Sequence, residues 1–293
     1  MEFHRIDGDR ELDHLRKFLS DSDPDDYLLD DIAEWIHRGR LWAGAEDEGW
    51  LAFGRLHDLG EGEGWVSGFR VAAPRRGKGL GGQLLGHILS DARLIGLTSL
   101  RAAIEVENVA SSRLFARFGF RPVLEVTLRC GRPQSTEGTA LEKARPGTRL
   151  PGRVGWFPER TGYVDLLPEV EGGRFGRWRP SLVERWANEG KLYVAPGLAV
   201  AVQMDWWKSP RTLWVNPLLG APAPLVSAVS SLAHELNHEE WQAFFLPSTD
   251  EARATYDRLG LSRHPFWGDR VQIFERNEPT GDIAPSRERR STP

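Results

Sequence analysis

The chain has 293 residues with a formal net charge of −4, and 40% of the residues are apolar. This length suggests two domains of ordinary size, and the slightly acidic balance argues against a general nucleic-acid-binding protein, which usually shows a basic footprint. The single cysteine, Cys130, excludes an intrachain disulfide framework and suits a reducing compartment. No apolar run approaches transmembrane length and the first residues are too polar for a signal peptide, so we expect a cytoplasmic protein that binds neither membrane nor nucleic acid.

The N-terminal segment is predicted to form a strand, two helices and two further strands. The helices are expected over 9–19, with Asp9 as the N-cap, and over 27–37, ended by Gly39. The strands are expected at 3–6, 41–45 and 50–56, the last two joined by the turn EDEG.

A glycine-rich turn follows a strand predicted over 64–71. The turn reads Arg76-Gly77-Lys78-Gly79-Leu80-Gly81-Gly82, and apolar residues at helical spacing predict a helix directly after it. Glycines let the backbone approach a ligand closely, and the N–H groups of a helix N-terminus favour negative charge. Together with the nearby cations, these features predict a cradle for a pyrophosphate.

The residue spacing of this turn does not fit two common phosphate-binding loops. A Walker loop needs Ser or Thr after its lysine, and Lys78 is followed by Gly79. Gly77, Gly79 and Gly82 formally match the dinucleotide fingerprint G-x-G-x-x-G. That fingerprint also requires an early strand and an acidic residue about twenty positions on, whereas Glu105 lies further along.

The chain instead resembles the GNAT acetyltransferases at two motifs. Arg76, Gly79 and Gly81 match the R-x-x-G-x-G coenzyme A loop, preceded by Val71 and Pro74 of its V-x-x-P lead-in. The second motif follows a strand predicted over 100–106 and precedes one predicted over 123–130. It reads Asn108-Val-Ala-Ser111-Ser-Arg-Leu-Phe115-Ala-Arg-Phe-Gly119-Phe120, and its Asn-x-x-Ser form is similar to the branch that includes α-amino acetyltransferases of ribosomal proteins.

This resemblance implies an acetyl-CoA-dependent N-acetyltransferase in which the strands before the loop and before Asn108 splay apart. It assigns the Val71 amide to the oxyanion, the amides of 77–82 to the pyrophosphate and Asn108 to the pantetheine arm. The expected cofactor-binding residues are Val71, Arg76, Gly77, Lys78, Gly79, Leu80, Gly81, Gly82, Asn108, Ser111 and Phe115.

The proton-transfer groups are less narrowly defined. Many family members carry Tyr at the position of Phe115, which cannot donate a proton. The resemblance to the Asn-x-x-Ser branch implies that the serine contacts the thiol, which makes Ser111 the candidate donor to the leaving thiolate. A small residue chosen for helix packing is the alternative explanation of Ser111. Glu63 and Glu105 are candidate bases, and Glu63 shares side-chain parity with Val71 on a regular strand. Both carboxylates can also be solvated surface groups, with solvent deprotonating the amine.

The second half of the chain repeats the first. Trp35, Gly39 and Leu41 recur with one common offset as Trp186, Gly190 and Leu192, and the segment 115–120 resembles 256–261. The counterpart of the cradle, 215–224, has one glycine, three prolines and no basic residue. Because proline lacks an N–H group, this second loop is predicted to be degenerate.

We therefore expect an α/β (α+β) fold of two tandem GNAT-like domains. Each is expected to be a mixed, mostly antiparallel sheet flanked by helices, with a splayed central strand pair. The expected division is a catalytic domain over 1–145, a degenerate domain over 146–276 and a flexible tail over 277–293. The tandem arrangement is compatible with a monomer that acts as a pseudo-dimer or with a homodimer.

One rival motif, His234-Glu235-Leu-Asn-His238, satisfies the zinc pattern H-E-x-x-H with Glu235 as base. The motif needs a helix that continues through His238 and a third ligand, for which Glu251 or His264 could be proposed. A helix predicted over 224–233 and a strand predicted over 241–246 leave little room for it. We therefore expect no metal and rank a zinc hydrolase last.

The expected reaction is direct transfer of an acetyl group from acetyl-CoA to a primary amine in a ternary complex. The acceptor is open between a small molecule, favoured because the groove is shared with a second copy, and a peptide amine. A non-catalytic acyl-CoA-binding or sensor protein is the alternative that Phe115 leaves open.

Overall fold

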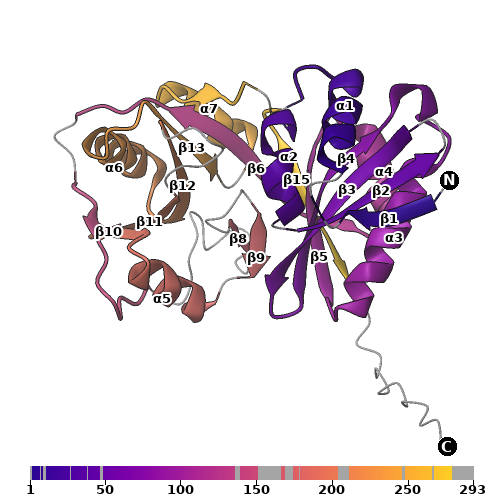
Figure 1. Cartoon of the computed structure of the whole chain (residues 1–293). Helices are drawn as coiled ribbons and strands as arrows, with labels where there is room; N and C mark the ends of the chain where they lie inside the picture. The colour runs from indigo at the N-terminus through magenta and orange to yellow at the C-terminus, as the bar shows by residue number, and fades with distance from the viewer. Residues whose placement is uncertain are drawn as a thin grey trace, which may run out of the picture.

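The computed structural model describes residues 2–6, 8, 11–26, 28–37, 39–46, 49–135, 139–150, 166–168, 174–177, 179–203, 211–245, 248–265 and 267–278. The first half has the predicted order of elements (Figure 1). They are β1 (Glu2–Ile6), α1 (Leu12–Ser22), α2 (Leu28–His37), β2 (Arg40–Glu46), β3 (Gly49–Gly60), β4 (Glu63–Val71), a short 3₁₀ turn (Ala73–Arg75), α3 (Leu80–Leu94), β5 (Ser99–Glu105), α4 (Val109–Arg117) and β6 (Arg121–Gly131).

The boundaries of the first two helices differ from the prediction at their caps. The expected N-cap Asp9 lies outside the described residues, and α1 begins at Leu12. The start of α2 is fixed by Asp26, whose Oδ1 accepts a hydrogen bond from the Leu28 N–H at 3.0 Å. An aspartate two residues before a helix commonly satisfies a free N–H group in this way.

The second half repeats this order in a reduced form. It contains β7 (Glu142–Lys143), β8 (Leu166–Pro168), β9 (Phe175–Arg177), α5 (Pro180–Asn188), β10 (Leu192–Ala195), β11 (Leu198–Gln203), β12 (Thr212–Leu219), α6 (Pro222–Glu235), β13 (Glu240–Phe245), α7 (Asp250–Arg258), β14 (Ser262–Arg263) and β15 (Val271–Asn277). The run from α5 to α7 matches the run from α2 to α4, so the tandem architecture predicted from the sequence repeats is confirmed.

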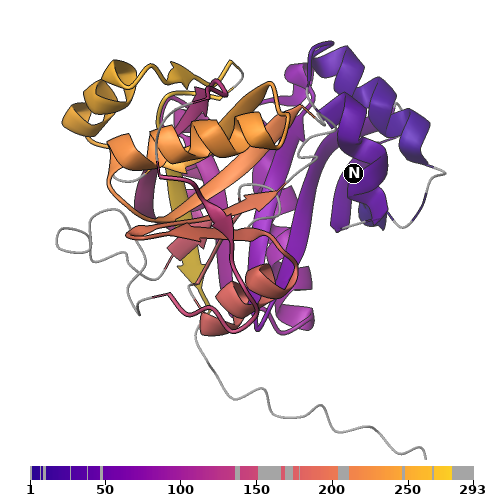
Figure 2. The same cartoon turned by 90° about the vertical axis from the view of Figure 1, so that its left-hand side faces the viewer.

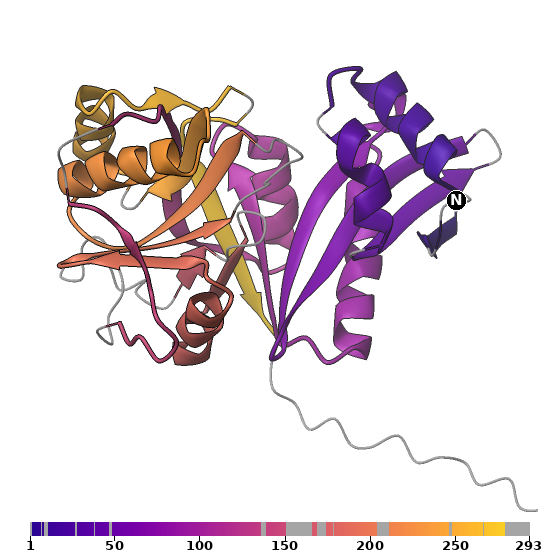
Figure 3. The same cartoon turned by 60° about the vertical axis from the view of Figure 1, so that its left-hand side comes forward.

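The two halves exchange their C-terminal strands. β15, from the end of the chain, lies between β5 and β6 and pairs antiparallel with both (Figure 3). β6 changes partners along its length, because its first part pairs with β15 while residues 127–131 pair with β13 of the second half. β14 also pairs with β6. Neither half therefore completes its own sheet.

This exchange crosses the boundary predicted between 1–145 and 146–276, which remains a prediction about sequence units. It also shortens the predicted tail. Asn277 pairs with Ser99, and the Glu278 N–H donates to the Thr98 carbonyl oxygen at 2.8 Å. The tail therefore begins no earlier than residue 279, and residues 279–293 lie outside the described part of the chain.

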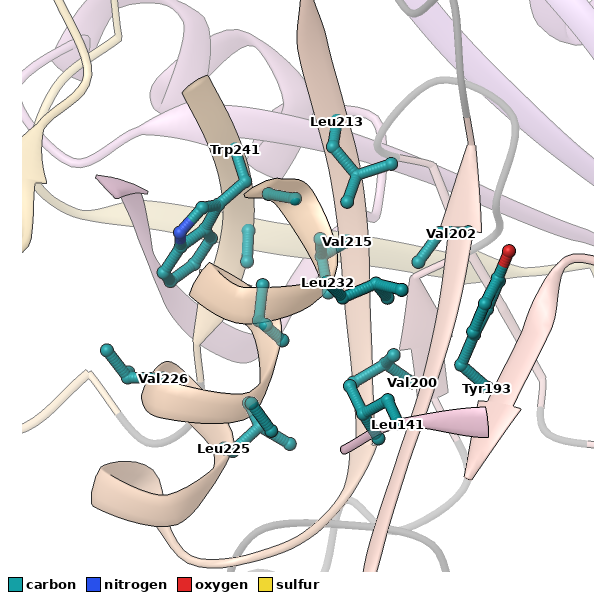
Figure 4. Packing of buried hydrophobic residues seen from close by; sticks show 14 of the residues in the cluster. Leu141, Tyr193, Val200, Val202, Leu213, Val215, Leu225, Val226, Leu232 and Trp241 are labelled. Atoms are coloured by element: carbon teal, nitrogen blue, oxygen red, sulfur yellow. The ribbon is translucent and has the colours of Figure 1, made fainter. Parts of the chain in front are cut away.

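Helices pack on the main sheet, which runs continuously through both halves of the described chain. In the first half, α1 and α2 pack on one face of the sheet and α3 and α4 on the other, each over its own buried apolar cluster. In the second half, α6 lies across the strands (Figure 2) and buries Leu225 and Leu232 against Val200 and Val215 (Figure 4). Between the halves, Trp65, Phe175 and Phe244 join a further buried cluster. Within the described residues, no helix has the length and apolarity needed to cross a membrane.

A buried ion-pair cluster at the start of β4 joins the two halves. Arg101 of β5 is fully buried and contacts Glu275 of β15 (Nε–Oε2 2.7 Å) and Glu63 of β4 (Nη1–Oε2 3.3 Å). Arg179, just before α5, reaches the same Glu63 oxygen at 2.9 Å, and the Arg177 N–H donates to it at 3.1 Å. Burial alone would raise the pKa of Glu63, but the charges of Arg101 and Arg179 and the Arg177 hydrogen bond outweigh it, so the pKa is lowered from 4.5.

Replacement of Glu63 by Gln is expected to make the free energy of unfolding depend less on pH in the acid range. Since the folded pKa is depressed, the carboxylate stabilises the fold above its unfolded pKa, and this contribution is lost as the pH falls through the folded pKa. Urea unfolding between about pH 3 and about pH 7 should show a shallower loss of unfolding free energy below pH ~4.5 in Glu63→Gln than in wild type. The exposed Glu184→Gln serves as the control and should keep the wild-type slope. A wild-type pH dependence of the unfolding free energy in Glu63→Gln would contradict the stabilising role assigned to the Glu63 carboxylate.

Candidate active site

The parallel strands β4 and β5 separate after a short paired region. They pair only from Glu63↔Ser99 to Trp65↔Arg101, although β4 continues to Val71 and β5 to Glu105. β5 keeps a partner on its other edge, because β15 pairs with it from Ser99 to Glu105. The edge of β4 from residue 66 to residue 71 therefore faces a gap, which confirms the predicted splayed strand pair.

A β-bulge at Gly68 changes which side chains of β4 face which helices. Arg55 and Phe53 of β3 pair with Ser67 and Arg70, so β4 carries one extra residue there, and Gly68 takes a φ of 68°. As a result, Phe69 and Val71 pack on the α3 side. Glu63, Trp65, Ser67 and Arg70 point to the opposite face. The parity predicted between Glu63 and Val71 is therefore wrong, because it assumed a regular strand.

The backbone of Val71 points into the gap. The Ala72 N–H donates to the Leu51 carbonyl oxygen of β3 at 2.9 Å. Because successive backbone groups of a strand point to alternate edges, the N–H and C=O of Val71 point away from β3. The Val71 carbonyl oxygen is taken by Arg76, whose Nε donates to it at 3.1 Å. Its N–H thus lies on the edge of β4 that has no neighbouring strand.

The glycine-rich turn forms an open nest of backbone donors at the start of α3. Gly77 and Gly79 have φ values of 76° and 84°, and Gly79 is the N-cap of the helix. A Cβ at either position would meet no atom within 4 Å, so this side of the turn is open. Within the described residues, the N–H groups of 77–81 donate to no backbone acceptor, whereas those of Gly82 and Gln83 both bond to the Gly79 carbonyl. Such a turn suits an anion.

The other two glycines of the turn serve packing. A Cβ at Gly81 would lie 3.2 Å from Leu114, and one at Gly82 would lie 3.6 Å from Phe118. These side chains come from α4 or its C-terminal end. Small residues here allow the start of α3 to approach α4 closely.

The three cations of the turn have different surroundings. Arg75 pairs with Glu46 at 3.0 Å, and Arg76 bonds to the Val71 carbonyl. Lys78 is exposed and takes part in no ion pair found among the described residues. Lys78 is therefore the cation most available to a bound phosphate.

The second predicted motif forms the start of α4 beside the gap. Asn108 is the N-cap, and its Oδ1 accepts from the Ser111 N–H at 3.1 Å. A capping role thus accounts for the Asn side-chain oxygen. The half-buried Ser111 hydroxyl takes part in no hydrogen bond seen in the described part of the chain.

Phe115 belongs to the apolar core under the gap. Its ring lies 5.5 Å from Phe69 of β4 and 5.0 Å from Phe120, both edge-on, and only 4% of the residue is exposed. Phe115 therefore belongs to the buried apolar cluster on the α3 side of the sheet. Its predicted contact with the cofactor stays a prediction.

The two candidate bases lie in different places. Glu63 starts β4, eight residues from Val71, or roughly 26 Å along a strand. With its lowered pKa and its arginine partners, it is a structural carboxylate and a poor base. Glu105 ends β5 on the face opposite α3, beside the gap. A Cβ added to Gly268 would lie 3.3 Å from Glu105 Oε2 and 3.1 Å from Glu107 Oε2, so the loop before β15 adjoins both carboxylates.

The second copy keeps the helix cap of this site and replaces part of its backbone donors by prolines. Thr249 Oγ1 accepts from the Ala252 N–H at 3.2 Å, as Asn108 does in the first copy. The counterpart of the cradle runs directly into α6 with Pro222 in its first turn. Tyr256, the counterpart of Phe115, is fully buried, and burial raises the pKa of its hydroxyl far above the ordinary value.

The zinc motif lacks the helix that it requires. α6 ends at Glu235, and Asn237 has a φ of 60°, so His234 and His238 do not lie one turn apart on a helix. Among the described residues, no three His, Cys, Asp or Glu side chains gather closely enough to hold a metal ion. The H-E-x-x-H segment therefore does not form the helical zinc site that the zinc hydrolase alternative requires.

The contact between Arg70 and Asp26 was not predicted from the sequence. The two residues form a largely buried ion pair between β4 and the segment before α2. Nothing in the spacing indicates this contact, since it depends on the bulge that turns Arg70 toward α2.

The family model described as "Acetyltransferase (GNAT) family" matches residues 10–120. None of the curated proteins matches the chain. Among solved structures, a GCN5-related N-acetyltransferase from Sphaerobacter thermophilus has a TM-score of 0.59 at 16% identity, covering 94% of this chain and 95% of that one. A tandem GNAT protein from the clavulanic acid biosynthesis pathway has a TM-score of 0.55 at 14% identity, covering 96% and 99%. At these identities the likeness establishes the tandem fold.

Proposed function

We propose that the first copy of this chain, in which residues 10–120 match the GNAT acetyltransferase family model, transfers an acetyl group from acetyl-CoA to a primary amine. The observation that carries the proposal is the nest of free N–H groups at 77–81 beside the gap between β4 and β5. An anion-binding turn next to an unpaired strand edge suits a long phosphorylated thioester.

The turn would hold the pyrophosphate of acetyl-CoA. Its residues fit this group, because Gly77 and Gly79 leave open space where a side chain would obstruct the approach. The free N–H groups and the N-terminus of α3 favour negative charge, and Lys78 adds a cation. The Asn108 side chain, at the start of α4, would meet the pantetheine arm on the other side of the gap.

Acetyl-CoA supplies the acetyl group as a thioester, whose carbonyl oxygen gains negative charge when an amine attacks. The Val71 N–H points into the gap and is the donor proposed for this oxygen. A fixed backbone donor at this point requires no reorganisation during the reaction. The new C–N bond forms and the C–S bond breaks in one ternary complex.

Two protons must move during this exchange. Glu105, directly or through water, is the group proposed to take the proton from the attacking amine, since it lies on the open face beside the gap. Ser111 is proposed to donate the proton to the leaving thiolate from the start of α4. The bond between the Asn108 side chain and the Ser111 N–H would fix the position of Ser111.

A small-molecule amine is the acceptor class that we favour, over a peptide amine. The loop before β15 adjoins Glu105 and Glu107, so the second copy narrows the approach to the gap. The strand exchange within one chain also supports a monomer that acts as a pseudo-dimer.

Phe115 favours one further candidate function, a protein that binds acyl-CoA without turnover. Its ring offers no proton and is buried against Phe69 and Phe120. Acetylation of any amine by the purified protein would remove this alternative.

The variant Gly79→Asp is expected to raise the Kd of acetyl-CoA about 100-fold or more, because a carboxylate in the nest repels the pyrophosphate. The matched control is Gly96→Asp, at the other end of α3, where the φ of 80° and the open space are alike. Isothermal titration should give one site per chain in wild type and in the control. Equal loss of binding in both variants would attribute the effect to backbone strain and contradict the nest, and two sites per chain would contradict an inactive second copy.

The variant Ser111→Ala is expected to lower kcat by about 10-fold to 100-fold if its hydroxyl protonates the thiolate. Its neighbour Ser112 is equally half-buried on α4, so Ser112→Ala provides the matched control and should keep wild-type kcat. Release of free thiol can be followed with a chromogenic disulfide. A wild-type kcat in Ser111→Ala would leave solvent as the proton donor.

A further inference from the structure

The segment before α2 is tied to β4 at the bulge. Arg70 Nε and Nη2 donate to Asp26 Oδ2 and Oδ1 at 2.6 and 3.0 Å, a bidentate pair in which the Asp26 side chain is only 3% exposed. Asp26 Oδ1 also accepts from the Leu28 N–H, so one carboxylate both receives Arg70 and caps α2. The third nitrogen of Arg70, Nη1, donates to the Phe69 carbonyl at 3.1 Å, which further restricts the side chain.

A second contact joins α2 to the same point of β4. A Cβ added to Gly68 would lie 2.5 Å from Cζ3 of Trp35, so the indole ring lies directly on the bulge. The guanidinium of Arg55 lies 4.5 Å from the centroid of the same ring. Gly68 thus serves two purposes, because it adopts a positive φ and leaves room for Trp35.

These contacts surround the residue proposed to bind the oxyanion. Gly68 and Arg70 lie three residues and one residue before Val71, whose N–H enters the gap. They face away from α3, on the side of the sheet that carries Ser67 and Glu105. The cofactor nest lies instead at the start of α3, on the other side of Val71.

We propose that Arg70, acting through Asp26, is a positioning residue that holds residues 23–26 and 28–35 over the bulge and so determines acceptor binding by the transferase. This inference rests on the proposed function. A bidentate guanidinium is needed because two parallel bonds fix orientation as well as distance, which a lysine cannot reproduce.

The decisive variants are Arg70→Met and Arg70→Lys, compared with Arg40→Met. Arg40 pairs with Asp91 through a single bond at 2.8 Å, whereas the Arg70 pair is bidentate, and the two pairs have similar exposure, 30% and 7% against 25% and 3%. The Arg40 pair joins β2 to α3, away from the bulge. It therefore controls for the general loss of a partly buried ion pair.

Steady-state kinetics would use the best acceptor of the wild-type protein from a panel of putrescine, tyramine and a short peptide with a free α-amine. Arg70→Met should raise the KM of that amine by about tenfold or more, with the Kd of acetyl-CoA nearly unchanged, since small displacements at a reacting centre are costly. Arg70→Lys should recover only part of the loss. Arg40→Met should keep the wild-type KM.

Hydrogen exchange provides a readout that needs no turnover. The amides of 23–26 and 28–35 should exchange faster in Arg70→Met and not in Arg40→Met. Wild-type protein that acetylates no amine would contradict the proposed function, while the exchange data would still decide whether Arg70 holds this segment. Equal exchange and KM in the two Met variants, or a parallel loss of acetyl-CoA affinity, would overturn the inference.

Discussion

The position of β15 between β5 and β6 is the constraint on which the rest of the structure depends. A parallel strand pair that separates leaves one edge of each strand without a partner, and a short strand such as β5 is not stable on one edge alone. β15 supplies seven residues of antiparallel pairing to β5. β4 can then diverge after Trp65 without unravelling its neighbour, and the divergence exposes the Val71 N–H. The site in the first half thus depends on a strand from the end of the chain.

The two copies share a scaffold but differ in the chemistry of one loop. The helix after β5 and the helix after β13 are each capped by a side-chain oxygen, from Asn108 or Thr249, and both bury an aromatic ring. The first copy keeps N–H groups at 77–81, whereas the second places prolines at the equivalent turn. Because proline removes the donor without preventing a helix start, the second copy can keep this fold with fewer N–H groups at the turn. Its remaining contributions are β15, the Arg179 contact to Glu63 and the loop beside Glu105.

The sequence was sufficient for the elements that depend on local patterns. Helical spacing predicted α3 after the glycine-rich turn, and the offset between Trp35 and Trp186 predicted the tandem fold. Prediction from the sequence failed where the structure depends on pairing between segments that are far apart in the chain. The bulge at Gly68 inverts the parity of β4, and this misplaced Glu63, whose partners Arg101 and Arg179 come from remote segments. Strand exchange likewise cannot be predicted from the local sequence pattern, because β6 and β15 would have the same pattern whichever strands they paired with.

The most direct test compares two shortened chains, one ending at Arg270 and one at Glu278, by unfolding and by titration with acetyl-CoA. The chain that ends at Glu278 retains β15 and the contacts of Glu278 with Thr98 and Arg93. It should unfold cooperatively and bind with wild-type affinity. The chain that ends at Arg270 lacks β15 and should lose both properties, because β5 then has an unpaired edge. Wild-type affinity in the chain that ends at Arg270 would contradict the account.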